Sequence, residues 1–158
     1  MMNYLLSLFF ILTIAPTVKV NNESEQKEVL QSIFDIEEFQ NYLTYSPRFV
    51  GTNTRLEVLM IEFPELIKND IDLKVRNKSI RIISEQQIKE LEHNFFIRIN
   101  AFDLKKSKAK VTLSYQNSRM YYESEQKLML EAKLEKNKMD KWVVENYELK
   151  EVKINTSD

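Results

Sequence analysis

The pattern of apolar and polar positions divides the chain into a helical part near the amino terminus and an extended part towards the carboxyl terminus. Asn22 and Glu25 have the spacing of a helix capping box, and acidic residues crowd the turn that follows. Pro47 and Gly51 then favour a break in the chain. Residues 21–45 are therefore predicted to form an amphipathic helix, whose apolar face consists of Val29, Leu30, Ile33, Phe34, Ile36, Phe39, Tyr42 and Leu43.

The next segment, residues 56–63, fits two kinds of secondary structure. Its apolar residues fall at helical spacing, whereas the unbroken run "VLMI" suits a buried strand, and periodicity alone does not choose between them. We favour a short second helix that ends near Pro64. Beyond it, "KSIRII" indicates a short strand and "SEQQIKEL" a short helix, in which Ser84 and Gln87 form a capping box.

From residue 94 onward the period changes to two, which is typical of half-buried antiparallel strands. The segment "KAKVTLSY" alternates cleanly, and "LMLEAKLEK" and "WVVENYELKEV" supply two further strands around a lysine-rich hairpin. In the last strand the apolar parity changes, so that either both faces are covered or a bulge switches the register. In "FFIRINAFDL", alternation places the following residues on one face: Phe96, Arg98, Asn100 and Phe102.

Helices first and strands last indicate an α+β protein. The expected architecture is an N-terminal amphipathic helix packed on a curved antiparallel sheet of about four strands. A chain of 158 residues and 18.9 kDa with 43% hydrophobic and 30% charged residues is one domain's worth of globular protein. We assign this single domain to residues 21–158.

The amino terminus carries an export signal. Residues 4–15 form an apolar run that is long enough for the core of a signal peptide and too short to span a bilayer comfortably. Polar and acidic residues follow at once, as at the start of a mature exported chain. Residues 1–20 are therefore predicted to be a signal peptide, or else an uncleaved anchor, and the protein to be periplasmic, exposed at the cell surface or secreted.

Composition excludes several kinds of site. The chain has no cysteine and one glycine, so disulfides, zinc-thiolate sites and glycine-rich phosphate loops are not expected. A net charge of -1 recruits neither nucleic acid nor anionic lipid, and membrane contact is expected only through an uncleaved leader. His93 is the single histidine and has no recognisable partner motif, which favours an architectural role. We predict no metal and no cofactor.

The segment "KAKVTLSY … LMLEAKLEKNKMDKWVVENYELKEV" resembles small exported bacterial proteins of uncharacterised function with a cystatin-like or nuclear-transport-factor-2-like α+β roll. The similarity is one of pattern and covers roughly residues 71–152. It implies a concave sheet whose pocket is closed by the helix. Proteins with that fold use such pockets for small-molecule binding, for isomerase or dehydratase chemistry, or for dimerisation, and fold alone does not choose among these.

The best candidates for ligand binding are Arg98, Asn100, Tyr115 and Tyr122. An arginine that faces a pocket would select an anion, and tyrosine offers contact area together with a hydroxyl group. No catalytic residue is assigned. We expect an exported, non-enzymatic protein that binds an unidentified small ligand or protein partner. The alternatives are an acid/base enzyme that uses Tyr115, Arg98 and His93, and a module that forms homodimers.

Overall fold

The computed structural model describes residues 23–43, 46–50, 53–63, 71–91 and 94–152. The predicted leader and His93 lie outside these ranges. Within them, no helix combines the length and the apolar character that crossing a membrane requires.

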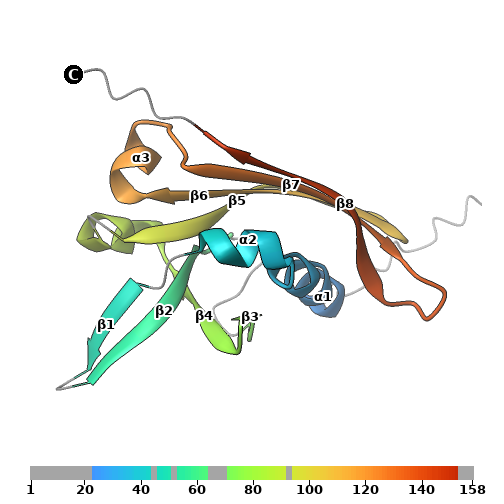
Figure 1. Ribbon diagram of the computed structural model, residues 1–158, viewed down its shortest axis with the longest axis horizontal. Helices are drawn as coiled ribbons and strands as arrows, with labels where there is room; N and C mark the ends of the chain where they lie inside the picture. Colours follow the sequence, from blue (N-terminus) through green and yellow to red (C-terminus); the bar gives the residue numbers. More distant parts are fainter. Residues whose placement is uncertain (1–22, 44–45, 51–52, 64–70, 92–93, 153–158) are drawn as a thin grey trace, which may run out of the picture.

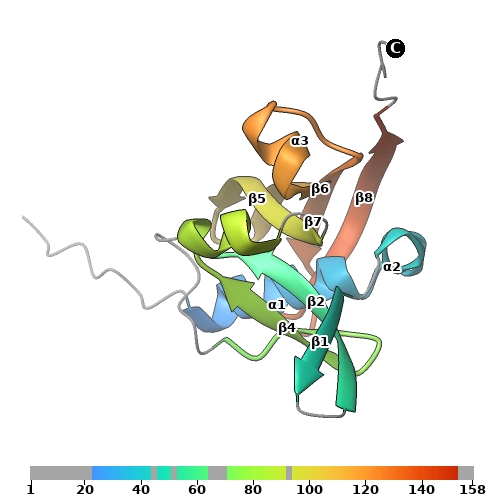
Figure 2. The ribbon, with the colours of Figure 1, turned by 90° about the vertical axis from the view of Figure 1, so that its left-hand side faces the viewer.

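The described part of the chain forms one eight-stranded sheet with four short helical segments, and the sheet curls around the first helix (Figures 1 and 2). The strand order is β3-β4-β2-β5-β6-β7-β8, and β1 pairs with β2 beside this path. The helical segments are α1 (Glu23–Phe34), α2 (Glu37–Tyr42), the 3-10 helix η1 (Glu85–Leu91) and α3 (Ser118–Tyr122). The strands are β1 (Ser46–Val50), β2 (Asn53–Ile61), β3 (Lys74–Val75), β4 (Lys78–Ile83), β5 (Phe95–Leu104), β6 (Lys108–Asn117), β7 (Leu128–Lys136) and β8 (Trp142–Glu151).

The expected architecture of a helix on an antiparallel sheet of about four strands is therefore wrong. The sheet is mixed, because β2 runs parallel to both β4 and β5. The error arises at residues 56–63, for which the sequence pattern fitted either a helix or a strand. Most of this segment belongs to strand β2, and it does not form a second helix. Strand β2 lies between two parallel neighbours and buries both of its faces, and such strands have continuous apolar runs without alternation.

The predicted N-terminal helix is divided into α1 and α2. The division occurs at Asp35 and Ile36, where Ile36 adopts an extended conformation. The rings of Phe34 and Phe39 stack with their centroids 6.3 Å apart, and both side chains are buried. Gln40 Nε2 donates to the carbonyl of Phe34 at 2.6 Å and so satisfies an acceptor at the end of α1. The break thus buries two aromatic rings that a straight helix would point apart.

Two apolar clusters lie on opposite faces of the sheet. The larger cluster fills the concave face, where α1 and α2 pack against strands β2–β8. The smaller one lies on the opposite face, between β2, β4, β5, η1 and α3, and consists of Leu59, Ile61, Ile83, Ile88 and Phe96 with Tyr121 packed against it. Strand β2 contributes to both clusters because successive side chains of a strand point to opposite faces.

Bulges change the side-chain parity in two strands. In β5 the register shifts at Asn100, so that Phe102 pairs with Val111 and packs in the concave core. The prediction that Phe102 shares a face with Arg98 is therefore wrong, because the extra residue reverses the alternation. In β8 the register shifts at Glu145, which confirms the bulge that the changed parity of this strand allowed.

The short elements between β2 and β5 agree with the sequence patterns. The segment "KSIRII" is strand β4, and the short helix that follows is the 3-10 helix η1. Gln87 Oε1 accepts from the backbone amide of Ser84 at 2.9 Å, which is half of the predicted capping box. This contact fixes the start of η1 at the end of β4, where Glu85 follows.

Ser124, directly after α3, is expected to be more stable as glycine. Its φ of 58° lies in the left-handed region, which costs a non-glycine residue roughly 1–2 kcal/mol. We expect Ser124→Gly to raise the free energy of unfolding by about 0.5–1 kcal/mol, measured by urea denaturation. The neighbouring Glu123 has a φ of -85°, so Glu123→Gly should be destabilising. Equal effects of the two substitutions would contradict the assigned backbone conformation.

Candidate functional site

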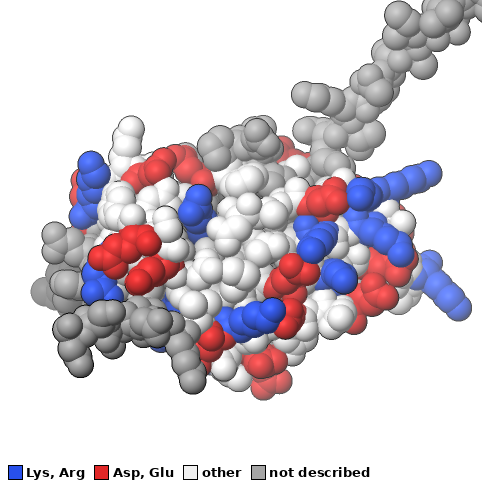
Figure 3. Space-filling view, turned by 90° about the horizontal axis from the view of Figure 1, so that it is seen from above, with Lys and Arg blue, Asp and Glu red and all other residues white. Residues whose placement is uncertain are grey.

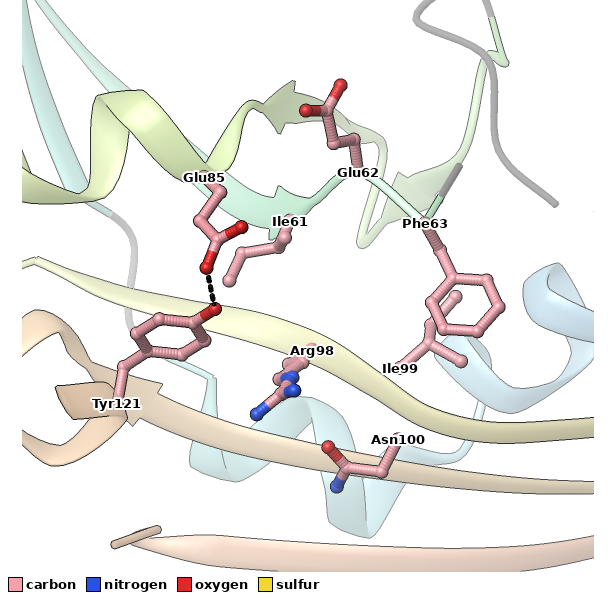
Figure 4. Close-up of a pocket in the computed structure, with 8 residues that line it drawn as sticks. All are labelled: Ile61, Glu62, Phe63, Glu85, Arg98, Ile99, Asn100 and Tyr121. Atoms are coloured by element: carbon pink, nitrogen blue, oxygen red, sulfur yellow. Dashed lines mark hydrogen bonds between the residues drawn. The ribbon is translucent and has the colours of Figure 1, made fainter. Parts of the chain in front are cut away.

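A pocket of about 270 Å³ opens beside the smaller apolar cluster (Figure 4). Four elements meet there: the end of β2, the start of η1, the middle of β5, and α3. Ile61, Phe63 and Ile99 form its apolar wall, and the polar lining consists of Glu62, Glu85, Arg98, Asn100 and Tyr121.

Arg98 and Asn100 are two positions apart in β5, so both reach the pocket from the same face of the strand. Arg98 pairs with Ser114 of β6, whereas Asn100 is the extra residue at the bulge and has no register partner. The Asn100 amide is held by the buried Ser114, whose hydroxyl donates to Asn100 Oδ1 at 3.3 Å. Figure 4 shows both side chains pointing into the same space.

Arg98 lies against an aromatic ring and has no charged partner among the described residues. Its guanidinium carbon is 5.1 Å from the centroid of the Tyr121 ring, within the range of a cation–π interaction. The side chain is exposed, and within the described ranges it makes neither an ion pair nor a hydrogen bond. The ring therefore orients the guanidinium without neutralising it, which leaves its donors available to an anion.

Tyr121 ties α3 to η1 at the edge of the pocket. Its hydroxyl donates to Glu85 Oε1 at 2.5 Å, and its ring packs edge-on against Phe96 and Tyr122, with centroids 6.0 Å and 5.4 Å away. The hydrogen bond to Glu85 raises the pKa of Tyr121 above its ordinary value of 10.0, because the bond favours the protonated hydroxyl, and partial burial adds to the shift. Tyr121 therefore stays neutral and donates at physiological pH.

We expect removal of the Glu85 carboxylate to lower the pKa of Tyr121. A raised folded-state pKa means that the hydrogen bond stabilises the protein fully below about pH 10 and ceases to do so as pH rises through that pKa. In an NMR titration of the Tyr121 ring, Glu85→Ala should move its ionisation to lower pH. Glu90→Ala, on the same 3-10 helix, serves as the control and should leave the titration unchanged. An unchanged titration in Glu85→Ala would show that the Tyr121–Glu85 bond does not form in solution.

A second, wider recess of about 540 Å³ adjoins the pocket. It shares Glu62 and Glu85 with the pocket, and its other lining residues are Ser84, Gln86, Lys89 and Tyr122. Tyr122 is 54% exposed and packs edge-on against Tyr121, so one aromatic pair borders both spaces. We call the two together the Arg98 groove, with a narrow end at Arg98 and a wide end at Lys89.

The structure brings three of the four predicted ligand-binding residues to this groove. Arg98 and Asn100 line the narrow end, and Tyr122 lines the wide end. Tyr115 is not there: it is 1% exposed and packs in the concave core, with its ring 5.1 Å from that of Phe95. Its position follows from the alternation of β6, in which Tyr115 shares a face with Leu113.

Of the polar residues that line the narrow end, three were missed by sequence reasoning. Glu62 and Glu85 follow the ends of β2 and β4, and their meeting depends on the parallel pairing of these strands, which the sequence did not reveal. Tyr121 was visible only as part of an aromatic cluster near a strand connection. Its place in the pocket depends on α3, a helix of five residues.

A further recess lies at the lysine-rich end of the sheet. A space of about 300 Å³ there is lined by Lys105, Lys108, Lys110 and Lys133 with two acidic residues. Three of these lysines are paired with carboxylates, at 3.1 Å (Lys105–Asp103), 3.5 Å (Lys108–Glu135) and 2.9 Å (Lys110–Glu131). Figure 3 likewise shows blue and red side chains interspersed across one face of the molecule. Charges paired in this way are typical of a solvated surface.

Among the described residues, no group of three or more histidine, cysteine, aspartate and glutamate side chains is placed to hold a metal ion.

No family model matches the chain, and no curated protein or solved structure shows significant similarity to it. The resemblance to small exported roll proteins accordingly stays a prediction.

Proposed function

We propose that the protein is an exported, non-enzymatic binding protein whose Arg98 groove takes a small organic anion. The observation that carries the proposal is the guanidinium of Arg98, which is exposed in a pocket and oriented by Tyr121 without a carboxylate partner among the described residues. An arginine presented in this way is suited to a carboxylate, because its planar donors match the two carboxylate oxygens.

The remaining lining of the narrow end indicates what the rest of the ligand is like. Ile61 and Ile99 are 7% and 2% exposed, and together with Phe63 they form the apolar part of the lining. Asn100 adds an amide that hydrogen-bonds a neutral polar atom. A carboxylate joined to a short apolar body matches the guanidinium of Arg98, the amide of Asn100 and the apolar lining.

Binding explains the groove better than acid/base catalysis does. A carboxyl group that acts as a general acid or base near neutral pH is usually buried, since burial brings its pKa into that range. Here Glu85 is exposed and Glu62 is half-buried. Tyr121 has a raised pKa, which disfavours its ionisation and therefore its use as a base.

A dimerising role gains little support from the outer face of β6–β8, where lysines and glutamates alternate.

Export is part of the proposal and rests on the apolar run of residues 4–15. An exported binding protein meets its ligand outside the cytoplasm, where a pocket that binds and releases a small molecule serves capture or delivery. Mass spectrometry of the protein isolated from its own cells tests this part separately. A mass that lacks the leader supports export, and an intact leader on a protein recovered from the cytoplasm contradicts it.

The binding proposal is tested by isothermal titration calorimetry with two ligands of equal chain length. Hexanoate carries the expected carboxylate and apolar body, whereas hexylamine has the same body with the opposite charge. We expect hexanoate to bind with one site per chain and hexylamine to bind more weakly by at least about tenfold, which corresponds to one charge-assisted hydrogen bond. Equal binding of the two, or preference for the amine, would refute selection of an anion by Arg98.

A further inference from the structure

We infer that the ligand of the Arg98 groove is the carboxyl-terminal end of a peptide with a basic residue near that end. This inference rests on the proposed function and specifies the class of anion. The terminal carboxylate is bound by Arg98, the last side chain packs on Ile61 and Phe63, and the preceding residues lie in the wide end of the groove.

The dimensions of the groove leave room for a ligand longer than one that fills the narrow end alone. The narrow end, at about 270 Å³, lies just below the range of roughly 300–1,000 Å³ that is typical of small-molecule pockets. The wide end, at about 540 Å³, borders it at the shared residues Glu62 and Glu85. A ligand that fills only the narrow end leaves the larger space empty. An extended chain that enters both ends uses the whole groove, and each residue of such a chain covers about 3.3–3.6 Å.

The sign of the charge changes along the groove. Arg98 lines only the narrow end and has no ion-pair partner among the described residues, Lys89 lines only the wide end, and the carboxylates of Glu62 and Glu85 line both ends, at the border between them. Glu62 has no ion-pair or hydrogen-bond partner for its side chain among the described residues. The groove therefore complements a ligand that is negative at its end and positive a short distance behind it. A C-terminal carboxylate preceded by a lysine or arginine has this order of charges.

The polar lining of the wide end also suits a peptide backbone. Each peptide unit carries a donor and an acceptor that must be satisfied when water is displaced. Ser84, Gln86 and Tyr122 line this end and offer hydroxyl and amide groups, which serve as both donors and acceptors. Tyr122 is 54% exposed and presents an aromatic surface beside these groups, a combination that is typical of sites for polar chains.

The test compares four ligands by calorimetry on the purified protein. They are acetyl-Gly-Lys-Ala-Leu with a free carboxylate, the same peptide as its C-terminal amide, acetyl-Gly-Ala-Ala-Leu with a free carboxylate, and N-acetyl-leucine. We expect the lysine peptide to bind at least about tenfold more tightly than its amide, because amidation removes the charge that Arg98 binds. It should also bind severalfold more tightly than either the alanine peptide or N-acetyl-leucine.

Glu62→Gln tests the pairing with the basic residue of the peptide, since it removes a charge at the border of the two ends and keeps the size of the side chain. We expect this substitution to weaken the lysine peptide severalfold and to remove most of its advantage over the alanine peptide, whereas an unchanged advantage would contradict the role of Glu62. If N-acetyl-leucine binds and the lysine peptide binds no better, the inference fails and the proposed function stands. If neither the peptides nor N-acetyl-leucine bind, both fail. Equal affinity for the free acid and the amide would overturn the assignment of Arg98 to the carboxylate.

Discussion

Leu113→Ala is expected to lower the free energy of unfolding by about 3–5 kcal/mol, the upper part of the range for a buried leucine. Leu113 is 1% exposed at the centre of β6, where it pairs with Ile99 of β5 and Leu130 of β7. The side chain is enclosed by neighbours on both adjacent strands and by the helices of the concave core, so the sheet has little freedom to close the cavity that truncation leaves.

Urea denaturation measures this effect, and Met139→Ala provides the control. Met139 lies in the hairpin between β7 and β8 and is 74% exposed, so its truncation should change the free energy of unfolding by less than about 0.5 kcal/mol. A loss of under about 1 kcal/mol for Leu113→Ala would contradict the register of the central strands.

Arg98→Met is expected to reduce the affinity for hexanoate by at least about tenfold while leaving the fold intact. Methionine keeps an apolar stem of similar length that can rest against the Tyr121 ring, and it removes the charge. Because Arg98 is exposed and makes no ion pair or hydrogen bond within the described part of the chain, its replacement leaves no buried partner unsatisfied. The melting temperature should therefore change by only a few degrees.

The matched control is Arg119→Met, which removes a positive charge from α3 outside the groove. Arg119 pairs with Glu123 at 3.7 Å on the surface, and such an exposed pair contributes little to stability. Calorimetry should show hexanoate binding to Arg119→Met as it does to the unmodified protein. If Arg98→Met also retained full affinity, another cation would have to bind the anion, and the assignment of the site would be wrong.

The four strands β5–β8 were predictable because each has a half-solvated character that leaves an alternating pattern. Strand β6 shows this most clearly: Ala109, Val111 and Leu113 are buried in the concave core, and Lys108 and Lys110 are exposed between them. Four apolar residues of strands β6–β8 are buried there: Val111, Leu113, Leu130 and Trp142.

The other half of the sheet was not predictable, because its pattern carries less information. Strand β2 is buried on both faces, so its residues do not alternate, and its apolar positions match helical spacing by coincidence. Parallel pairing of β2 with β4 and β5 joins segments that are distant in sequence. Once β2 is assigned to a helix, these pairings are lost, and with them the mixed sheet.

The residues of the candidate site were likewise predictable mainly where they lie in the antiparallel strands with a clear sequence pattern. Arg98 and Asn100 were found because polar residues inside an apolar strand are conspicuous. Glu62 and Glu85 were missed because their proximity depends on the parallel strands. Tyr115 was placed wrongly because its residue type favoured a ligand site, whereas the parity of its own strand already assigned it to the core.

The most direct test of the account is nitrogen–proton correlation NMR of the protein during a titration with hexanoate. If the carboxylate binds at Arg98, the largest shifts occur for the backbone amides of residues 98–101 and 118–122, which form β5 beside the pocket and helix α3. If the largest shifts instead fall on residues 105–110 and 131–135, the ligand occupies the lysine-lined recess and the account of Arg98 is wrong. The same conclusion would follow if no amide shifted.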